Sequence, residues 1–210
     1  NYMFAVRGGA DKSNYSISYN HLDEKGIFLG NNYRHDNARA KLNLKKGIFD
    51  FDANIAFKFT DNKQPRYSLK EMYMISPLVP IYDEGQPSGY GLTNFDGIPN
   101  NRNVMADYFF RSSSNKKYHT TANIGIDMHL TDWLNFRTSY AYRGEHERSM
   151  WHEPVYVADI RSKTEFPNHE EYAGYWEEQV FDNVLSFNKM IDKHSVNAMI
   201  GTSLSDEKTN

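Results

Sequence analysis

The sequence contains no cysteine, so it has neither a disulfide framework nor a metal site built on thiolates. Long hydrophobic runs are missing as well. No stretch of about 18 apolar residues exists, which excludes a transmembrane helix. Excess positive charge is also absent: 24 Lys and Arg stand against 27 Asp and Glu, spread along the chain, for a net charge of −3. There is therefore no broad electrostatic case for nucleic-acid binding.

Aromatic residues, in contrast, are abundant. They make up 15% of the sequence, with 15 Tyr and 13 Phe. Tyr, Phe, Ile and Thr occur in short runs separated by Asn, Asp, Gly and Lys, which is typical of β-strands and turns. The mean hydropathy of −0.76 indicates a water-soluble protein at first. A strand in a membrane barrel, however, exposes only every second residue to lipid, so its mean hydropathy stays low.

Strict alternation is clearest over Phe49–Phe59, where apolar and polar residues occupy opposite faces of a predicted strand. A tilted strand needs about 9–11 residues to cross a bilayer core, and this segment has that length. About eight such segments are predicted. The others are Tyr2–Gly9, Tyr15–Leu22, Tyr33–Leu44, Tyr118–Leu130, Leu134–Arg143, Gln179–Lys189 and His194–Ser203. The final residues, Ser205–Asn210, are expected to form a loop.

The connections between these segments alternate between short and long. Short ones lie at Gly9–Asn14, Lys45–Gly47, Thr131–Trp133 and Met190–Lys193; long ones lie at Asp23–Asn32, 61–117 and 144–175. All long connections would therefore lie at one end of an antiparallel sheet. Short periplasmic turns and long extracellular loops are typical of outer-membrane barrels.

Aromatic residues also gather near the predicted strand ends, as do the rings of a membrane interface. They are Tyr33, Phe49, Phe59, Tyr118, Trp133, Tyr142 and Trp176. Cross-strand packing in a soluble sheet is the other interpretation of these residues.

Several runs, taken in order, resemble the early barrel of SusC/RagA-type TonB-dependent transporters of Bacteroidetes. In that family a strand, a "DxxGI" loop and an "N-x-R-x-N-L" strand follow one another, as Gly8–Ser18, Asp23–Ile27 and Arg34–Leu44 do here. Pro77–Gly85 resembles a proline-rich stretch of the next long loop. Leu130–Leu134 resembles the turn before the following strand. The resemblance covers nearly the whole chain, and the order and spacing of the motifs are what make it specific.

The resemblance implies an all-β fold, an antiparallel transmembrane β-barrel segment with about eight strands of a larger, roughly 22-stranded barrel. Residues 1–210 would be part of one barrel domain, without its plug and C-terminal strands. The implied function is outer-membrane import of oligosaccharides or peptides. The implied partners are a SusD-like surface lipoprotein as lid, TonB through the absent plug region, and outer-membrane lipid.

Eight strands left as an open sheet would have two unpaired edges, which lipid cannot satisfy. The chain opens directly into strand-like sequence with no signal-peptide pattern, so we expect it to be an internal part of a longer polypeptide. Two alternatives remain open. One is a soluble or surface-attached β-sandwich that binds glycans, and the other is a small self-closed barrel with an adhesive or structural role.

Enzymatic motifs are not supported. His146-Glu147 and His152-Glu153 suggest a metalloprotease, but Met150 occupies the position of the second histidine at i+4. Gly89-Tyr90-Gly91 lacks the rest of a dinucleotide fingerprint. We therefore expect a protein that is not an enzyme, with no catalytic residues, no metal and no cofactor.

Ligand contacts are expected in the long loops. Aromatic side chains there suit stacking on sugar rings or peptide side chains, and polar ones suit hydrogen bonds to hydroxyls or carboxylates. The predicted substrate-binding residues are Tyr82, Asp83, Tyr90, Asn94, Arg102 and Trp151. The alternative is that they hold the fold of the loops or contact the lid.

Overall fold

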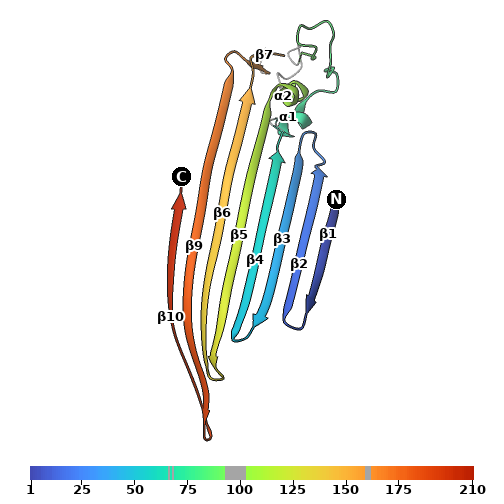
Figure 1. Cartoon of the computed structure of the whole chain (residues 1–210). Coiled ribbons are helices and arrows are strands. Elements are labelled where there is room, and N and C mark those ends of the chain that lie inside the picture. The colour runs from blue at the N-terminus through green and yellow to red at the C-terminus, as the bar shows by residue number, and fades with distance from the viewer. Residues whose placement is uncertain (66, 68, 93–102, 159–161) are drawn as a thin grey trace.

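A computed structural model describes the chain except for residues 66, 68, 93–102 and 159–161. Eight long strands form one sheet, and two short helices and a small hairpin gather at one end of it (Figure 1). The elements are β1 (Tyr2–Ala10), β2 (Ser13–Lys25), β3 (Asn32–Lys46), β4 (Phe49–Lys63), α1 (Leu69–Met74), α2 (Val104–Phe110), β5 (Ser112–Thr131), β6 (Leu134–Glu153), β7 (Tyr156–Val157), β8 (Lys163–Thr164), β9 (Asn168–Ile191) and β10 (His194–Thr209).

The large sheet is an antiparallel meander with strand order β1-β2-β3-β4-β5-β6-β9-β10. The predicted antiparallel all-β fold with eight long strands is confirmed. Strands β1 and β10 are the two edges, and they do not pair with each other in the described structure. The alternative of a self-closed eight-stranded barrel is therefore wrong, and the sheet has two unpaired edges.

The predicted alternation of connections is also confirmed. Two-residue turns at 11–12, 47–48, 132–133 and 192–193 join strands at one end of the sheet, which we call the turn end. Residues 26–31, 64–111 and 154–167 connect strands at the other end, which we call the loop end. Neither helix among the described residues has the length and apolar character that a membrane-crossing helix requires.

The pairing register gives the sheet two chemically different faces. Ile55 lies between Ala40 and Ala122, whereas its neighbour Asn54 lies between Lys41 and Asn123. Because side chains alternate along a strand, the face that carries Ile55 is here called the apolar face and the other the polar face. The apolar face carries Phe4, Val6, Tyr15, Ile17, Leu42, Leu44, Phe51, Ile55, Phe57, Ile124, Ile126, Tyr140, Phe181, Leu185, Ile200 and Leu204.

No second layer covers the apolar face in the described structure. Phe57 is 56% exposed and Ile200 is 71% exposed, although both sit in the interior of their strands. The buried hydrophobic residues all lie in the connections at the loop end: Val79, Tyr90, Val104, Ala106, Tyr156 and Ala158. A two-layer sandwich, with a core between sheets, is therefore not the fold of the described chain.

The strands are longer than the sequence predicts. β6 continues to Glu153 and β9 begins at Asn168, so much of the expected 144–175 loop is paired strand. Likewise β4 extends to Lys63 and β5 begins at Ser112 within the expected 61–117 loop. The expectation of a terminal loop is wrong in the same way, because Ser205–Thr209 pairs with β9. Polar residues predominate on both faces of these segments, so no regular alternation marks them as strands.

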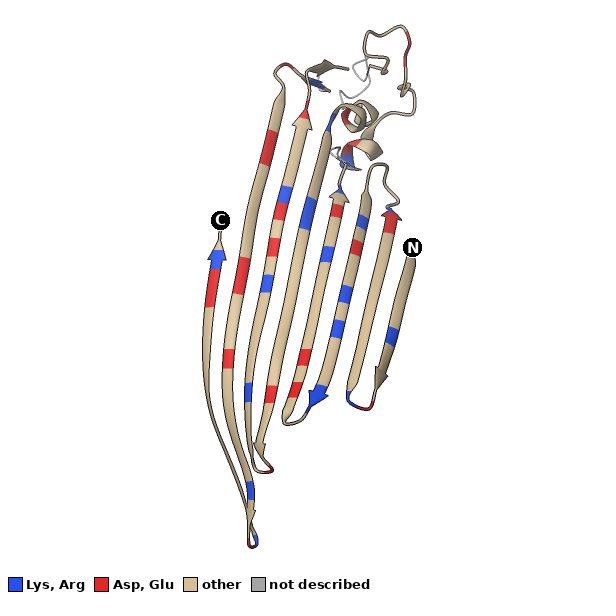
Figure 2. Ribbon diagram, in the orientation of Figure 1, with Lys and Arg blue, Asp and Glu red and all other residues tan. Residues whose placement is uncertain are grey.

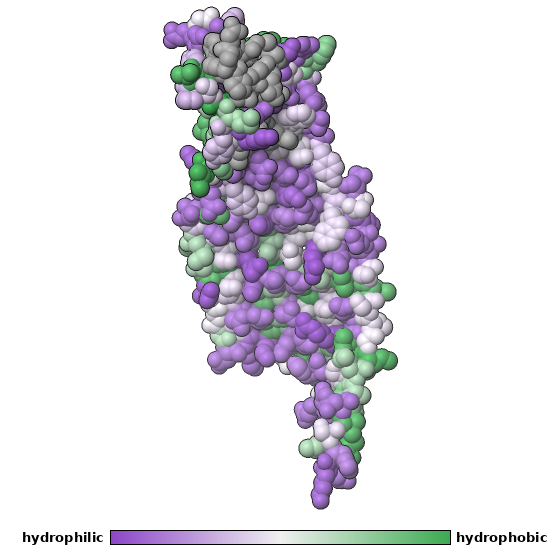
Figure 3. All heavy atoms as spheres, turned by 180° about the vertical axis from the view of Figure 1, so that it is seen from behind, coloured by the Kyte–Doolittle hydropathy of each residue, from purple (hydrophilic) through white to green (hydrophobic). Residues whose placement is uncertain are grey.

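Charged residues are distributed along all parts of the sheet rather than confined to its ends (Figure 2). From behind, hydrophilic residues cover most of the upper sheet, and hydrophobic residues lie among them toward the turn end (Figure 3). The upper strand extensions carry cross-strand ion pairs such as Arg148 with Glu171. Backbone pairing and such polar contacts hold these extensions together without an apolar face.

Candidate functional site

Two long connections fold together at the loop end. We call the described residues of 64–111 and 154–167 the loop unit. Asn103 is its central link: it is 4% exposed, and its backbone N–H donates to Ser162 Oγ at 2.8 Å. Its Nδ2 donates to the carbonyl oxygens of Ile81 at 3.2 Å and Gly91 at 3.0 Å. Its Oδ1 accepts from the N–H of Ala106 at 3.2 Å and so caps α2.

Polar contacts around α2 provide a second link between the two connections. The Tyr156 hydroxyl donates to the Asp107 carboxylate at 2.7 Å, and both side chains are buried. The Phe110 ring stacks on Tyr156 with centroids 4.6 Å apart. Arg111 forms an ion pair with Glu153 at 2.5 Å, at the point where β6 ends. The loop unit therefore has its own small core and rests directly on the sheet.

The ionisation of this core follows from its burial. Burial of the Tyr156 phenol, and then its hydrogen bond to Asp107, raise its pKa far above the usual value. Burial also raises the pKa of Tyr90. Both phenols therefore stay neutral at physiological pH and act as hydrogen-bonding and packing groups.

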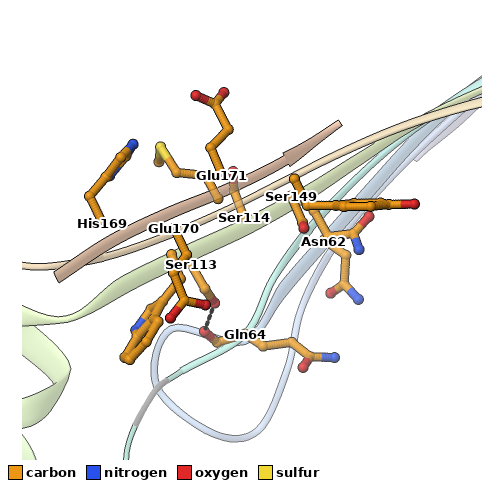
Figure 4. A pocket seen from close by; sticks show the side chains of 12 residues that line it. Asn62, Gln64, Ser113, Ser114, Ser149, His169, Glu170 and Glu171 are labelled. Atoms are coloured by element: carbon orange, nitrogen blue, oxygen red, sulfur yellow. Dashed lines mark hydrogen bonds between the residues drawn. The ribbon is translucent and has the colours of Figure 1, made fainter. Parts of the chain in front are cut away.

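A pocket of about 700 Å³ lies where β4, β5, β6 and β9 reach the loop end (Figure 4). Its lining on the polar face comprises Asn62, Gln64, Ser113, Asn115, Ser149, Trp151, Glu170 and Tyr172. Ser113 Oγ donates to the carbonyl oxygen of Gln64 at 2.7 Å, which ties the start of the loop unit to β5. Glu171 and His169 point to the opposite side of the sheet from Ser113 and Gln64.

A charged network borders this pocket on the polar face. Asn115 Nδ2 donates to Glu147 at 2.6 Å, and Lys117 Nζ contacts Glu145 at 2.8 Å and Glu147 at 3.1 Å. His119 lies 3.1 Å from Glu145. The two carboxylates thus share one lysine. The pocket combines amide and hydroxyl groups with Trp151 and an acidic rim, a lining suited to polar, hydrogen-bonding ligands.

The structure separates the predicted binding residues. Tyr90 is 8% exposed and belongs to the loop core, whereas Tyr82 is 62% exposed and pairs with it through an isolated β-bridge. Asp83 accepts the N–H of Gly85 at 2.9 Å and shapes a turn. Trp151 lies on β6, in the pocket. Tyr82, Asp83 and Tyr90 are near one another, and none of them lines the pocket that contains Trp151.

Asn94 and Arg102 lie outside the described residues. The pocket residues Asn62, Ser113, Ser149 and Glu170 were missed by the sequence reasoning, because it assigned most of that region to loops. Ser113, Trp151 and Glu170 occupy one row of the register across the neighbouring strands β5, β6 and β9, and no local pattern in the sequence marks that row.

The histidines at 146, 152 and 169 fall within the expected 144–175 loop, but they lie on paired strands. His152 pairs with His169 across β6 and β9, with ring centroids 5.6 Å apart, and His146 lies further down β6. Among the described residues, no group of three or more His, Asp or Glu side chains is arranged to hold a metal ion.

A single antiparallel meander with one apolar face, one polar face and every long connection at one end is the wall of a β-barrel. Neither a protein-family model nor a curated protein matches the chain. Solved structures do match: they share 14% sequence identity with this chain, and the matches cover 99% of it. They are the RagAB peptide importer in its closed-closed state (TM-score 0.70), the RagAB peptide transporter (0.73) and the importer in its open-open state (0.69).

The chain spans 24–25% of the length of the matched chains in those structures. At this identity the likeness shows the fold: the eight strands have the arrangement of a segment of a RagAB chain.

Proposed function

We propose that this chain forms part of the barrel wall of an outer-membrane TonB-dependent importer and has no enzymatic role. The apolar face contacts lipid, and the polar face lines the lumen or contacts a domain within it. One observation carries the proposal: a single-layer sheet exposes apolar side chains in the middle of every strand. Such a broad apolar surface is unfavourable in water and favourable against acyl chains.

The height of the apolar band supports this orientation. On β5 the band runs from Tyr118 to Leu130, and Lys116 lies just before it on the same face. Twelve residue steps cover about 40 Å along a strand, or roughly 28 Å when the strand tilts by about 45°. A hydrocarbon core is about 30 Å thick. Phe59 and Tyr118 pair at one border, with ring centroids 5.0 Å apart, and Trp133 and Phe187 at the other, 5.3 Å apart.

The loop unit then lies outside the cell, above the lumen. We propose that it forms part of the vestibule and contacts a SusD-like lipoprotein, while TonB acts through a plug outside this chain. The cargo is a peptide or an oligosaccharide. The matched RagAB structures are of a peptide importer, which favours peptides over oligosaccharides as the cargo. Trp151 and the polar residues of its pocket are proposed to contact cargo. Tyr82, Asp83 and Tyr90, with Asn94 and Arg102, are proposed as further contacts.

Site-directed spin labelling tests the orientation of the sheet. Because this chain has no cysteine, single cysteines at Ile55 and Ile124 on one face, and at Asn54 and Asn123 on the other, introduce unique labels into it. The complete protein is placed in lipid vesicles, and the accessibility of each label to oxygen and to a water-soluble nickel chelate is measured. We expect oxygen to dominate at Ile55 and Ile124 and the chelate at Asn54 and Asn123.

The matched pairs are adjacent in sequence, so differences in depth or local mobility cannot produce the alternation. Equal accessibility on the two faces, or recovery of the complete protein in the soluble fraction, contradicts the proposal. Uptake of a labelled peptide and of a labelled oligosaccharide by cells with and without the protein then identifies the class of cargo.

A further inference from the structure

Three cations on the polar face have no partner in the described structure. Arg7 on β1 and Arg39 and Lys41 on β3 are exposed and make no ion pair or side-chain hydrogen bond with described residues. Lys58 on β4 adds a fourth such cation nearby. Most other cations of this face are paired, including Lys117 with Glu145 and Arg143 with Glu178. The positive charge of β1–β4 is therefore unusual for this sheet.

The register brings the three cations together. Arg7 and Lys41 both pair with Ser16, from opposite sides, and Arg39 pairs with Ser18. Two strand spacings separate Arg7 from Lys41, or about 9.6 Å. Arg39 lies two residues along the same strand, about 6.7 Å from Lys41. These separations allow the long side chains to converge on one anionic group.

The surface between them is hollowed. Ala5, Gly9, Ser16 and Ser18 are the small residues that form its floor, and Arg7, Arg39 and Lys41 stand around them. The hollow has a volume of about 940 Å³. We call it the basic trough. Figure 2 shows basic residues along β1, β3 and β4, below the loop unit.

One carboxylate, Asp11 in the turn after β1, lines the trough, and the other nearby carboxylates of the polar face contact cations outside it. Asp50 contacts Lys45 at 3.1 Å and His129 at 3.3 Å. Asp52 contacts Arg137 at 3.0 Å, toward the turn end of the sheet. Three cations therefore face one carboxylate, and the trough keeps a net positive charge that an external anion can balance.

We propose that the basic trough is a binding subsite for carboxylate groups of the transported ligand, and that it favours acidic peptides as cargo. This inference rests on the proposed function, since it places the trough inside the lumen. Guanidinium groups bind carboxylates through paired charge-assisted hydrogen bonds, and Lys41 adds a point charge. The trough lies toward the turn end of the sheet, so cargo that leaves the pocket at the loop end meets it later in its passage through the lumen.

Binding of two matched peptides to the purified complete transporter tests the subsite. Hexaglutamate and hexaglutamine have the same length and nearly the same shape, and they differ in charge. The triple variant Arg7→Gln, Arg39→Gln, Lys41→Gln is compared with Arg143→Gln, which removes a paired cation from the same face. Affinity is measured by fluorescence anisotropy at low salt and at about 0.5 M salt, where screening is strong.

We expect the triple variant to bind hexaglutamate roughly tenfold more weakly, with hexaglutamine and the melting temperature unchanged. Arg143→Gln should change neither affinity. High salt should weaken hexaglutamate binding to the natural protein and have little effect on the triple variant. Import of labelled hexaglutamate by cells should fall in parallel.

Three results overturn the subsite. One is that the natural protein does not bind hexaglutamate or does not prefer it to hexaglutamine. Another is that the triple variant keeps this preference. The last is that both affinities and the melting temperature fall together, which assigns the trough to a protein segment within the lumen. A failure of the proposed function itself is distinct, because the spin labels would then show no alternation.

Discussion

Tyr156 donates a hydrogen bond of 2.7 Å to Asp107, a residue 49 positions earlier in the chain and only 1% exposed. The two residues belong to different long connections, β7 and α2. Their contact makes the loop unit one folded body with a buried core, rather than two independent loops. The first two predictions concern this body.

Tyr156→Phe removes the hydroxyl and keeps the ring that stacks on Phe110. Loss of a hydrogen bond to a buried carboxylate costs about 1.5–3 kcal/mol. We expect the amides of α2 and β7 to exchange hydrogen faster in the complete protein, while those of the long strands do not change. Hydrogen-exchange mass spectrometry measures this. Tyr82→Phe is the control, because Tyr82 is 62% exposed. Equal exchange in both variants would count against the structural role of Tyr156.

Asn103 has two roles that substitutions can separate. Asn103→Asp keeps the acceptor that caps α2 and loses the Nδ2 donor to Ile81 and Gly91. We expect faster exchange around residues 81–91 and little change within α2. Asn103→Ala loses both functions, and removal of the cap alone costs about 1 kcal/mol. Faster exchange in α2 as well is therefore expected only for alanine. The same exchange pattern in both variants would contradict this division.

A charged side chain on the apolar face should destabilise the protein. In the proposed orientation, Ile124→Arg places a guanidinium toward lipid, which costs about 2–4 kcal/mol near the middle of a bilayer. Asn123→Arg introduces the same group at the adjacent position of the polar face, where water or protein can solvate it. We expect a lower free energy of unfolding in urea, and less folded protein in the outer membrane, only for Ile124→Arg. Equal effects at both positions would show that the two faces do not meet different surroundings.

Trp151 provides a test of the pocket at the loop end. Trp151→Ala removes the tryptophan from the lining of this pocket and leaves the polar lining in place. Truncation of an aromatic contact residue costs about 2 kcal/mol or more at a binding hot spot, so cargo affinity should fall roughly 30-fold. Trp133→Ala, at the turn end, is the control. Binding of the imported ligand to the purified complete protein measures the effect, and unchanged affinity assigns Trp151 a structural role.

Part of this structure could be predicted because apolar and polar residues alternate along several strands. Ile55 and Asn54 are adjacent and differ sharply in polarity, so the strand and its two faces are visible in the sequence. In Gly144–Glu153 polar residues predominate on both faces, with Met150 and Trp151 as the large apolar exceptions. The sequence therefore gives no period there, and only pairing with β5 and β9 makes that segment a strand.

The candidate site depends still more on contacts that are distant in the chain. Trp151 was expected to bind ligand from within a loop, but its pocket is built by four strands and the start of the loop unit. Asn103 and Ser162 are 59 residues apart, and no local pattern marks them as partners. The basic trough likewise joins Arg7 to Lys41 through the strand between them.

The sequence by itself determined the strand period, the turns and the gathering of the long connections at one end of the sheet, because each follows from neighbouring residues. The tertiary structure alone decided how far the strands extend, which loop residues form a core, and which cations share a hollow. Those features depend on register and on long-range hydrogen bonds, whose partners are chosen by the folded sheet as a whole.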